Sequence, residues 1–347
     1  NGGWDAFVIK IEKTGADVEH FTYFGSPGDD AFTTIIIDQS GNTVVGGWTA
    51  SNELETFPVK SRVWVPDEKD YYYGGHWEES GANPYDVEFN GGATDAIIVK
   101  FTSESLLTFS TYFGGKGEDK ARRVLASKDG RITVVGTTTS SDLPLPEGSA
   151  SAYRGRSDVF VFGLSPDGLR LNSCLYYGGT GNDEAGDAAL DAKESIVLTG
   201  STTSTDLPQA GAGTSNATLG AEDVFLATVT SSEVLYSTVM GWMGSDKSTS
   251  MALDVRGDVF LAGTTTSTLP GQALAANTDG WVAKWAYGTL AFRNPAAGSV
   301  FCTGSQVTIS WITEEIAATS TYGVDYSTDN GLTWMSAASG VKAKSYI

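Results

Sequence analysis

The side chains best suited to chemistry in this sequence are carboxylates, and they recur at matched places along the chain. Adjacent acids such as Asp29–Asp30 and Glu118–Asp119 are the residue types that glycoside hydrolases use as acid and as nucleophile or base. An acid nevertheless follows a glycine by two residues in four successive segments, at Asp30, Asp119, Asp183 and Asp246. An acid that returns in every segment is typical of a structural turn, whereas a catalytic pair occurs once. The sequence therefore predicts no catalytic residue, and we expect the protein not to be an enzyme.

A second set of aspartates opens a short apolar segment each time, as in DAFVIKI and DVFVFGL. Its members are Asp5, Asp95, Asp158, Asp223 and Asp279. We expect both sets to be turn or strand-start residues whose carboxylates accept hydrogen bonds from nearby backbone N–H groups. Calcium bound at these acids is the rival hypothesis. The prediction is therefore no metal and no cofactor, with structural calcium as the alternative to test.

Other kinds of chemistry find little support in the sequence. The only histidines, His20 and His76, are far apart, so a histidine-based zinc site or catalytic triad is not expected. Cys174 and Cys302 form neither a disulfide framework nor a metal motif, and the sequence leaves open whether they pair. The segment from Ser327 to Trp334 matches the Asp-box pattern S-x-D-x-G-x-x-W, which we interpret as a hairpin turn because it occurs only once.

The elements that carry these acids recur along the chain. The glycines that open one block lie at positions 28, 117, 181 and 244, which gives steps of 89, 64 and 63 residues. Each period holds four short candidate strands, namely an Asp-led strand, an aromatic strand ending in glycine, an AALDA-type strand and an IVLTG-type strand. Four strands per repeat without helices predict the blades of an all-β β-propeller. A β-solenoid is the alternative, but solenoid coils are usually much shorter.

These motifs carry a resemblance to a known family. D-A-F-V-x-K, Y-F-G-G, G-x-D-x-A, V-x-G-x-T-x-S and a closing Leu-Pro or Phe-Pro resemble the SBBP family of bacterial β-propeller repeats. The resemblance covers residues 5 to about 285, in four copies and a partial fifth that stops after Asp279–Trp285. It implies a secreted or surface-exposed bacterial protein but no particular chemistry, since fold alone does not determine function.

The pattern changes after the last repeat, so we expect two domains, a propeller at 1–287 and a second module at 288–347. Asn294–Gly298 has the composition of a linker, and the alternation in Gln306–Ile312 favours an immunoglobulin-like or fibronectin-like β-sandwich. That module is shorter than a complete sandwich, so we expect it to be truncated. Asp279–Trp285 is expected either to close the ring or to belong to a protein with further blades upstream.

The charge balance excludes some partners. The chain has 22 Lys and Arg against 42 Asp and Glu, a formal net charge of −20. Nucleic acids and anionic membrane surfaces both require basic patches, so we expect neither nucleic-acid binding nor direct membrane insertion. Solubility in a salty extracellular medium explains the acidity, and bound calcium is the alternative explanation.

The first repeat carries a long insertion at about 60–88. From Pro58 to Asp95 the chain advances 37 residues, against 14, 15 and 9 in the other repeats. The expected partner-binding residues are its aromatic side chains: Trp64, Tyr71, Tyr72, Tyr73, Trp77 and Tyr85. Aromatic residues offer large, rigid contact area, although packing of the loop on its own blade explains them equally well.

Three functions remain open from the sequence. The first is a non-catalytic secreted or cell-surface scaffold or adhesion protein that contacts other extracellular proteins or surface glycans. The second is a carbohydrate-binding module that acts through the insertion. The third is a polysaccharide-active enzyme with its site at the propeller centre. That enzyme would require a cluster of non-repeating acids or arginines on one blade face, and sequence inspection finds none.

Overall fold

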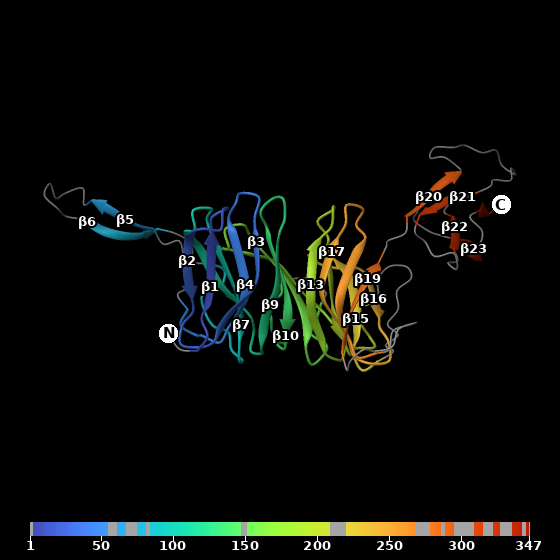
Figure 1. The fold of residues 1–347 in the computed structure, drawn as a ribbon, viewed down its shortest axis with the longest axis horizontal. Helices are drawn as coiled ribbons and strands as arrows, with labels where there is room; N and C mark the ends of the chain where they lie inside the picture. Colours follow the sequence, from blue (N-terminus) through green and yellow to red (C-terminus); the bar gives the residue numbers. More distant parts are fainter. Residues whose placement is uncertain are drawn as a thin grey trace. The chain divides into compact units, whose positions relative to one another are not determined.

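The computed structural model describes the backbone and side chains of residues 3–54, 84–146, 151–208, 220–267 and 278–285. It also describes the backbone of strands at 61–66, 75–80, 289–294, 309–314, 322–326, 335–341 and 345–346. Every element among these residues is a β-strand (Figure 1). The described chain contains no helix long and apolar enough to cross a membrane. The chain divides into two compact units, Asn1–Ala252 with Leu261–Val282, and Leu253–Phe260 with Ala283–Ile347.

Three complete four-stranded antiparallel sheets repeat along the chain, each with its strands paired in sequence order. The first consists of β3 (Asp30–Ile37), β4 (Thr43–Thr49), β7 (Asp95–Phe101) and β8 (Leu107–Phe113). The second consists of β9 (Asp119–Ala126), β10 (Ile132–Thr138), β11 (Asp158–Leu164) and β12 (Leu171–Tyr177). The third consists of β13 (Asp183–Leu190), β14 (Ile196–Thr202), β15 (Asp223–Val229) and β16 (Val234–Met240).

Two shorter sheets have part of the same pattern. A two-stranded sheet pairs β1 (Ala6–Ile11) with β2 (Val18–Phe24). A three-stranded sheet has the order β17 (Asp246–Leu253), β18 (Val259–Thr265) and β19 (Asp279–Trp285). The strand proposed to close a ring, β19, is thus the third strand of its own sheet. Among the described strands, β1 and β2 pair only with each other.

Each sheet starts two strands later than the four-strand repeat described from the sequence, which was counted from the Asp-led strand. Each sheet begins at the strand that follows G-x-D and ends at the aromatic strand, so the Asp-led strand is third rather than first. Tight turns such as Asp38–Asn42 join the first two strands, with Asp38 accepting hydrogen bonds from the backbone of Ser40 and Asn42, each at 2.9 Å. The chain crosses to the next sheet only after the aromatic strand.

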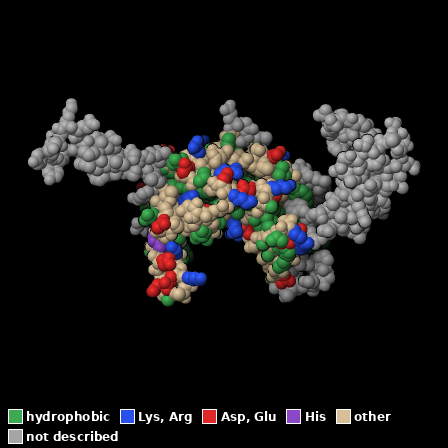
Figure 2. Space-filling view, turned by 90° about the horizontal axis from the view of Figure 1, so that it is seen from above, with side chains coloured by type: hydrophobic (Ala, Val, Ile, Leu, Met, Phe, Trp, Pro, Cys, Tyr) green, Lys and Arg blue, Asp and Glu red, His purple; other side chains and the backbone are tan. Residues whose placement is uncertain are grey.

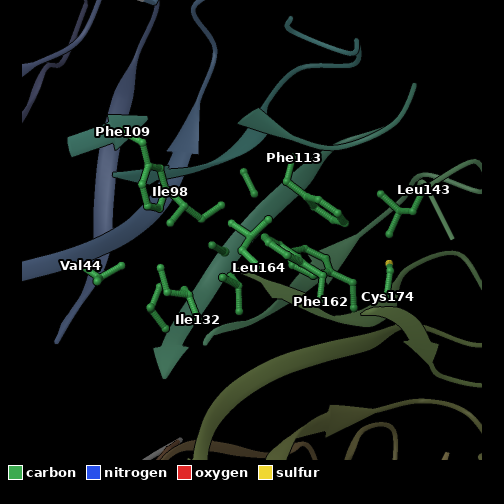
Figure 3. Packing of buried hydrophobic residues seen from close by; sticks show 14 of the residues in the cluster. Val44, Ile98, Phe109, Phe113, Ile132, Leu143, Phe162, Leu164 and Cys174 are labelled. Atoms are coloured by element: carbon green, nitrogen blue, oxygen red, sulfur yellow. The ribbon is translucent and has the colours of Figure 1, made fainter. Parts of the chain in front are cut away.

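The hydrophobic core lies between consecutive sheets (Figure 3). Phe113 of β8 stacks on Phe162 of β11 with ring centroids 3.7 Å apart, beside Ile98 and Ile132. A second cluster joins the next two sheets, where Tyr177 and Phe225 have ring centroids 5.2 Å apart. Cores on both faces explain why β7, β11 and β14 are buried along their whole length. Cys174 is a free, buried thiol in the first of these clusters.

The C-terminal strands form two small antiparallel sheets. One has the order β20 (Thr289–Asn294), β21 (Ile309–Glu314) and β24 (Ser345–Tyr346), with Phe292 opposite Trp311. The other pairs β22 (Tyr322–Tyr326) with β23 (Met335–Val341). An immunoglobulin-like sandwich and the 287/288 boundary stay predictions. Cys302 and the Asp-box segment lie outside the described residues.

Candidate functional site

The acids of the G-x-D set join consecutive sheets. Asp183 Oδ2 accepts hydrogen bonds from Gly179 N at 2.7 Å and Ser204 Oγ at 2.8 Å, and Thr202 Oγ1 donates to its Oδ1. Asp119 is held in the same way by Gly115 N at 2.9 Å and Ser140 Oγ at 2.7 Å. Each carboxylate thus ties the end of one sheet's aromatic strand to the loop after the next sheet's second strand. This role explains why T-x-S recurs with G-x-D, and Asp30 and Asp246 occupy equivalent places.

A glycine lies between an aspartate that opens an Asp-led strand and one of the aspartates described above. A Cβ on Gly178 would lie 2.4 Å from Asp158 Oδ1 and 2.9 Å from Asp183 Oδ2, so only glycine fits between the two carboxylates. Gly114 separates Asp95 from Asp119 in the same manner. Asp95 Oδ2 also accepts a hydrogen bond from Asn90 N at 2.5 Å, and Asp158 Oδ2 one from Arg154 N at 2.8 Å. Asp223 is fully buried, whereas Asp5 and Asp279 are partly exposed.

Burial raises the pKa values of these acids. The pKa of Asp95 rises to about 7 through burial, with repulsion from Asp119 adding to the rise. Burial likewise raises the pKa of Asp158 to about 6, with Asp183 adding to the rise, and raises the pKa values of Asp119 and Asp183. Within the described residues, no group of three or more His, Cys, Asp or Glu side chains is arranged to hold a metal ion. Hydrogen bonds to Asp119 and Asp183 join consecutive sheets, and the choice between metal-free joints and bound calcium stays a prediction.

The insertion contains a hairpin of its own. Strands β5 (Ser61–Pro66) and β6 (Gly75–Ser80) pair in register, with Trp64 directly opposite Trp77. Among the described strands, β5 and β6 pair only with each other. Tyr71, Tyr72 and Tyr73 lie outside the described residues.

Tyr85 is partly buried, and its place as a contact residue stays a prediction. Its side chain packs against the cluster between the first two sheets, and its N–H donates to Gly168 O at 2.8 Å. Burial raises the pKa of its hydroxyl to about 12. The next residue, Asp86, bonds β8 through its N–H to Thr111 Oγ1 at 2.8 Å. The segment from 84 onward is therefore part of the first sheet's packing.

The first strands of the sheets line a cavity of about 450 Å³. Thr33 Oγ1 of β3 donates to Ala121 O of β9 at 2.7 Å. Arg122 of β9 reaches two further strands, donating from Nε to Gly186 O at 2.8 Å and from Nη2 to Thr249 O at 3.4 Å. Gly186 permits the close approach of β13 and β17, since a Cβ there would lie 2.1 Å from Ser248 O. Four strands from four sheets thus meet at this cavity.

The cavity wall carries charges that do not repeat. Lys120 Nζ lies 2.6 Å from Glu118 Oε1, and Lys247 Nζ lies 2.8 Å from Glu222 Oε1 and 3.8 Å from Glu184 Oε2. This corrects the expectation that no cluster of non-repeating charges exists on one face. The signal was present in the residue after each buried aspartate, which is Ala31, Lys120, Glu184 or Lys247. Figure 2 shows basic and acidic side chains intermixed on the face seen from above.

Trp48 is a second departure from the repeat at the same cavity. The equivalent positions before the end of the second strand hold Thr137, Ser201 and Thr264. Trp48 is half-buried, and Lys120 Nζ lies 5.5 Å from its ring centroid. Sequence reasoning did not single out this tryptophan, although comparison of the four repeats position by position would have found it.

Comparison with known proteins gives little similarity. No family model matches the chain, and no curated protein matches it. The SBBP resemblance therefore stays a prediction. Twelve chains of solved structures match, among them an X-ray structure provisionally assigned as a gluconolactonase. That structure shares 12% identity at a TM-score of 0.28, over 70% of this chain and 61% of its own length. We infer neither fold nor activity from so distant a similarity.

Proposed function

We propose that this chain is a non-catalytic scaffold of an extracellular or cell-surface assembly, and that the hairpin β5–β6 is its contact with a partner protein or glycan. The observation that carries the proposal is the hairpin's place in the fold. It lies in the connection between the second and third strands of the first sheet, which has 45 residues. The same connections in the next two sheets have 19 and 20 residues, so the sheet does not require the addition. Long connections in compact domains tend to be functional.

The hairpin's own physics supports a contact role. A two-stranded hairpin is marginally stable in water when nothing packs against it. The unpaired edge of such a hairpin offers N–H and C=O groups to an added strand. Trp64 and Trp77, directly opposite each other, supply the aromatic residues that dominate binding energy at interfaces. Acids nearby, such as Asp67 and Glu78, would form a polar rim that favours a basic partner.

Glu222, which pairs with the cavity residue Lys247, favours binding over catalysis. A glycosidase needs a carboxylic acid that stays protonated near neutral pH. Although burial opposes it, hydrogen bonds from Lys247 and Ser245 hold the pKa of Glu222 below its usual value. Lys247 in turn has a raised pKa because it donates to Glu222. The pair is a stable salt bridge, which positions groups but does not supply a proton.

The hairpin is tested by replacing residues 60–82 with a short Gly/Ser connector. We expect the unfolding midpoint to change by less than about 3 °C, because loop length affects stability weakly. Retention on at least one purified extracellular-matrix protein or surface polysaccharide of an array should fall by more than about tenfold, or ~1.4 kcal/mol. The matched control places the same connector at 209–219, the corresponding connection of the third sheet, and should retain binding. Loss of folding, or unchanged retention, would show that the hairpin is not a contact site.

A further inference from the structure

Repetition separates residues that hold this fold from residues that do not. The buried aspartates and the T-x-S pairs recur because every joint between sheets needs them. The cavity differs in this respect. The residue three places after Asp30 is Thr33, and the equivalent residues in the next three sheets are Arg122, Gly186 and Thr249. These residue types differ from sheet to sheet, although Thr33 and Arg122 also form hydrogen bonds between strands and Gly186 allows a close approach of β13 and β17. Their convergence on one cavity points to a ligand.

We propose that the cavity lined by β3, β9, β13 and β17 binds a neutral sugar ring of a glycan. Its volume of about 450 Å³ falls within the ~300–1,000 Å³ typical of small-molecule sites. This site is separate from the hairpin β5–β6 and does not depend on the proposed contact there.

The cavity lining combines apolar residues, Trp48, Ala121 and Ala185, with charged ones, among them Lys120, Glu184 and Lys247. Trp48 contributes a half-buried indole beside Lys120 Nζ, and the part of the ring that Lys120 leaves uncovered offers apolar surface to the C–H groups of a pyranose. The side chains of Lys120, Lys247 and Glu184 line the cavity and are 43%, 44% and 55% exposed. Salt bridges restrict the two lysines, so less side-chain entropy is lost when a ligand hydroxyl binds them.

The pairing of charges decides the class of sugar. Lys120 is compensated by Glu118, and Lys247 by Glu222 and Glu184. The guanidinium of Arg122 donates to two backbone carbonyls. A charged ligand would compete with these pairs for the same ammonium and carboxylate groups. Hydroxyl groups can accept from the ammonium groups and donate to the carboxylates while the pairs remain, so a neutral sugar is favoured.

The test uses the full chain and oligosaccharides in solution. The neutral probes are maltohexaose, cellohexaose, mannohexaose and chitohexaose, and the charged comparators are oligogalacturonate and chitosan oligomers. Saturation-transfer NMR and tryptophan fluorescence measure binding. We expect at least one neutral probe to bind and every charged comparator to bind more weakly or not at all. The neutral probe should be recovered unhydrolysed, and a chain with the hairpin replaced should bind it equally well.

The variants use residues that other repeats already carry. Trp48→Thr introduces the residue found at 137 and 264, and Lys247→Ala introduces the residue found at 31. Each should weaken binding by more than about tenfold while the unfolding midpoint stays close to that of the parent. Lys116→Ala, at an 87% exposed side chain outside the cavity, is the control and should bind like the parent.

Several results would overturn the proposal. Absence of binding by all four neutral probes at about 10 mM would do so, as would tighter binding of a charged comparator. Weakening by Trp48→Thr but not by Lys247→Ala would place the ligand in the neighbouring cavity lined by Trp4 and Phe7. Hydrolysis of a bound probe would replace a binding site with a catalytic one.

Discussion

Asp183→Ala is expected to lower the free energy of unfolding by about 2–4 kcal/mol. The substitution removes the acceptor for Gly179 N, Ser204 Oγ and Thr202 Oγ1, all at a joint buried between two sheets. Each donor left unpaired costs about 1–3 kcal/mol, and relief of the buried charge offsets part of the sum. Urea unfolding followed by circular dichroism measures the change.

Two matched variants define that result. Asp183→Asn keeps one acceptor oxygen and should lose less than Asp183→Ala. Asp129→Ala removes an exposed carboxylate that pairs with Arg131 at 2.7 Å, and should change stability far less than Asp183→Ala. If Asp183→Ala proved as mild as Asp129→Ala, the joints would not depend on these hydrogen bonds.

The protein should become more stable as the pH falls from about 8 to about 5. Asp95, with a pKa of about 7, and Asp158, with one of about 6, retain protons in the folded state that the unfolded chain releases near pH 4. Between these values the folded state binds more protons, so the unfolding free energy falls as the pH rises. We expect a difference of at least about 2 kcal/mol across this window, because raising the pKa of one group by about one corresponds to ~1.4 kcal/mol.

Unfolding at several pH values in EDTA measures this effect, and Asp95→Asn should flatten the profile. Below about pH 4 the trend should reverse, because Asp38, Asp142 and Asp206 have lowered pKa values and lose their stabilising ionised form there.

Adding calcium at pH 8 should leave the unfolding midpoint unchanged. A large rise with calcium would mean that a cation is held between the paired carboxylates, because a ligand that binds only the folded state stabilises it.

The existence of the strands was predictable from the sequence, but their grouping into sheets was not. Four strands per period follow from turn residues and apolar runs, and the unbroken apolar run at Val159–Leu164 predicts a strand buried on both faces. A repeat has no intrinsic first strand, however, so the sequence is consistent with several ways of grouping successive strands into sheets. The grouping is decided by where the chain leaves one sheet for the next, which is at Gly114 and Gly178 beside the paired acids.

The cavity escaped sequence reasoning for a different reason. A sequence pattern reveals residues of one kind that lie close together along the chain. The cavity instead brings together residues of different kinds from equivalent positions of different sheets. Lys120, Glu184 and Lys247 are more than 60 residues apart along the chain and meet only because first strands lie side by side. Tyr85 is a different case. Its place in an insertion suggests exposure, but its side chain is partly buried against the cluster between the first two sheets, and its N–H donates to Gly168 O.

Hydrogen–deuterium exchange tests most directly the central claim that recognition resides in the hairpin β5–β6 while the repeated residues only maintain the fold. The measurement compares the free chain with the chain bound to the protein or polysaccharide that retains it on the array. We predict slower exchange on binding at 61–80, because a marginally stable hairpin gains hydrogen-bonded support from its partner. The joints around Asp119 and Asp183 should exchange at the same rate in both states. Protection confined to the joints or to the outer strands β8, β12 and β16, with none at 61–80, would contradict the account.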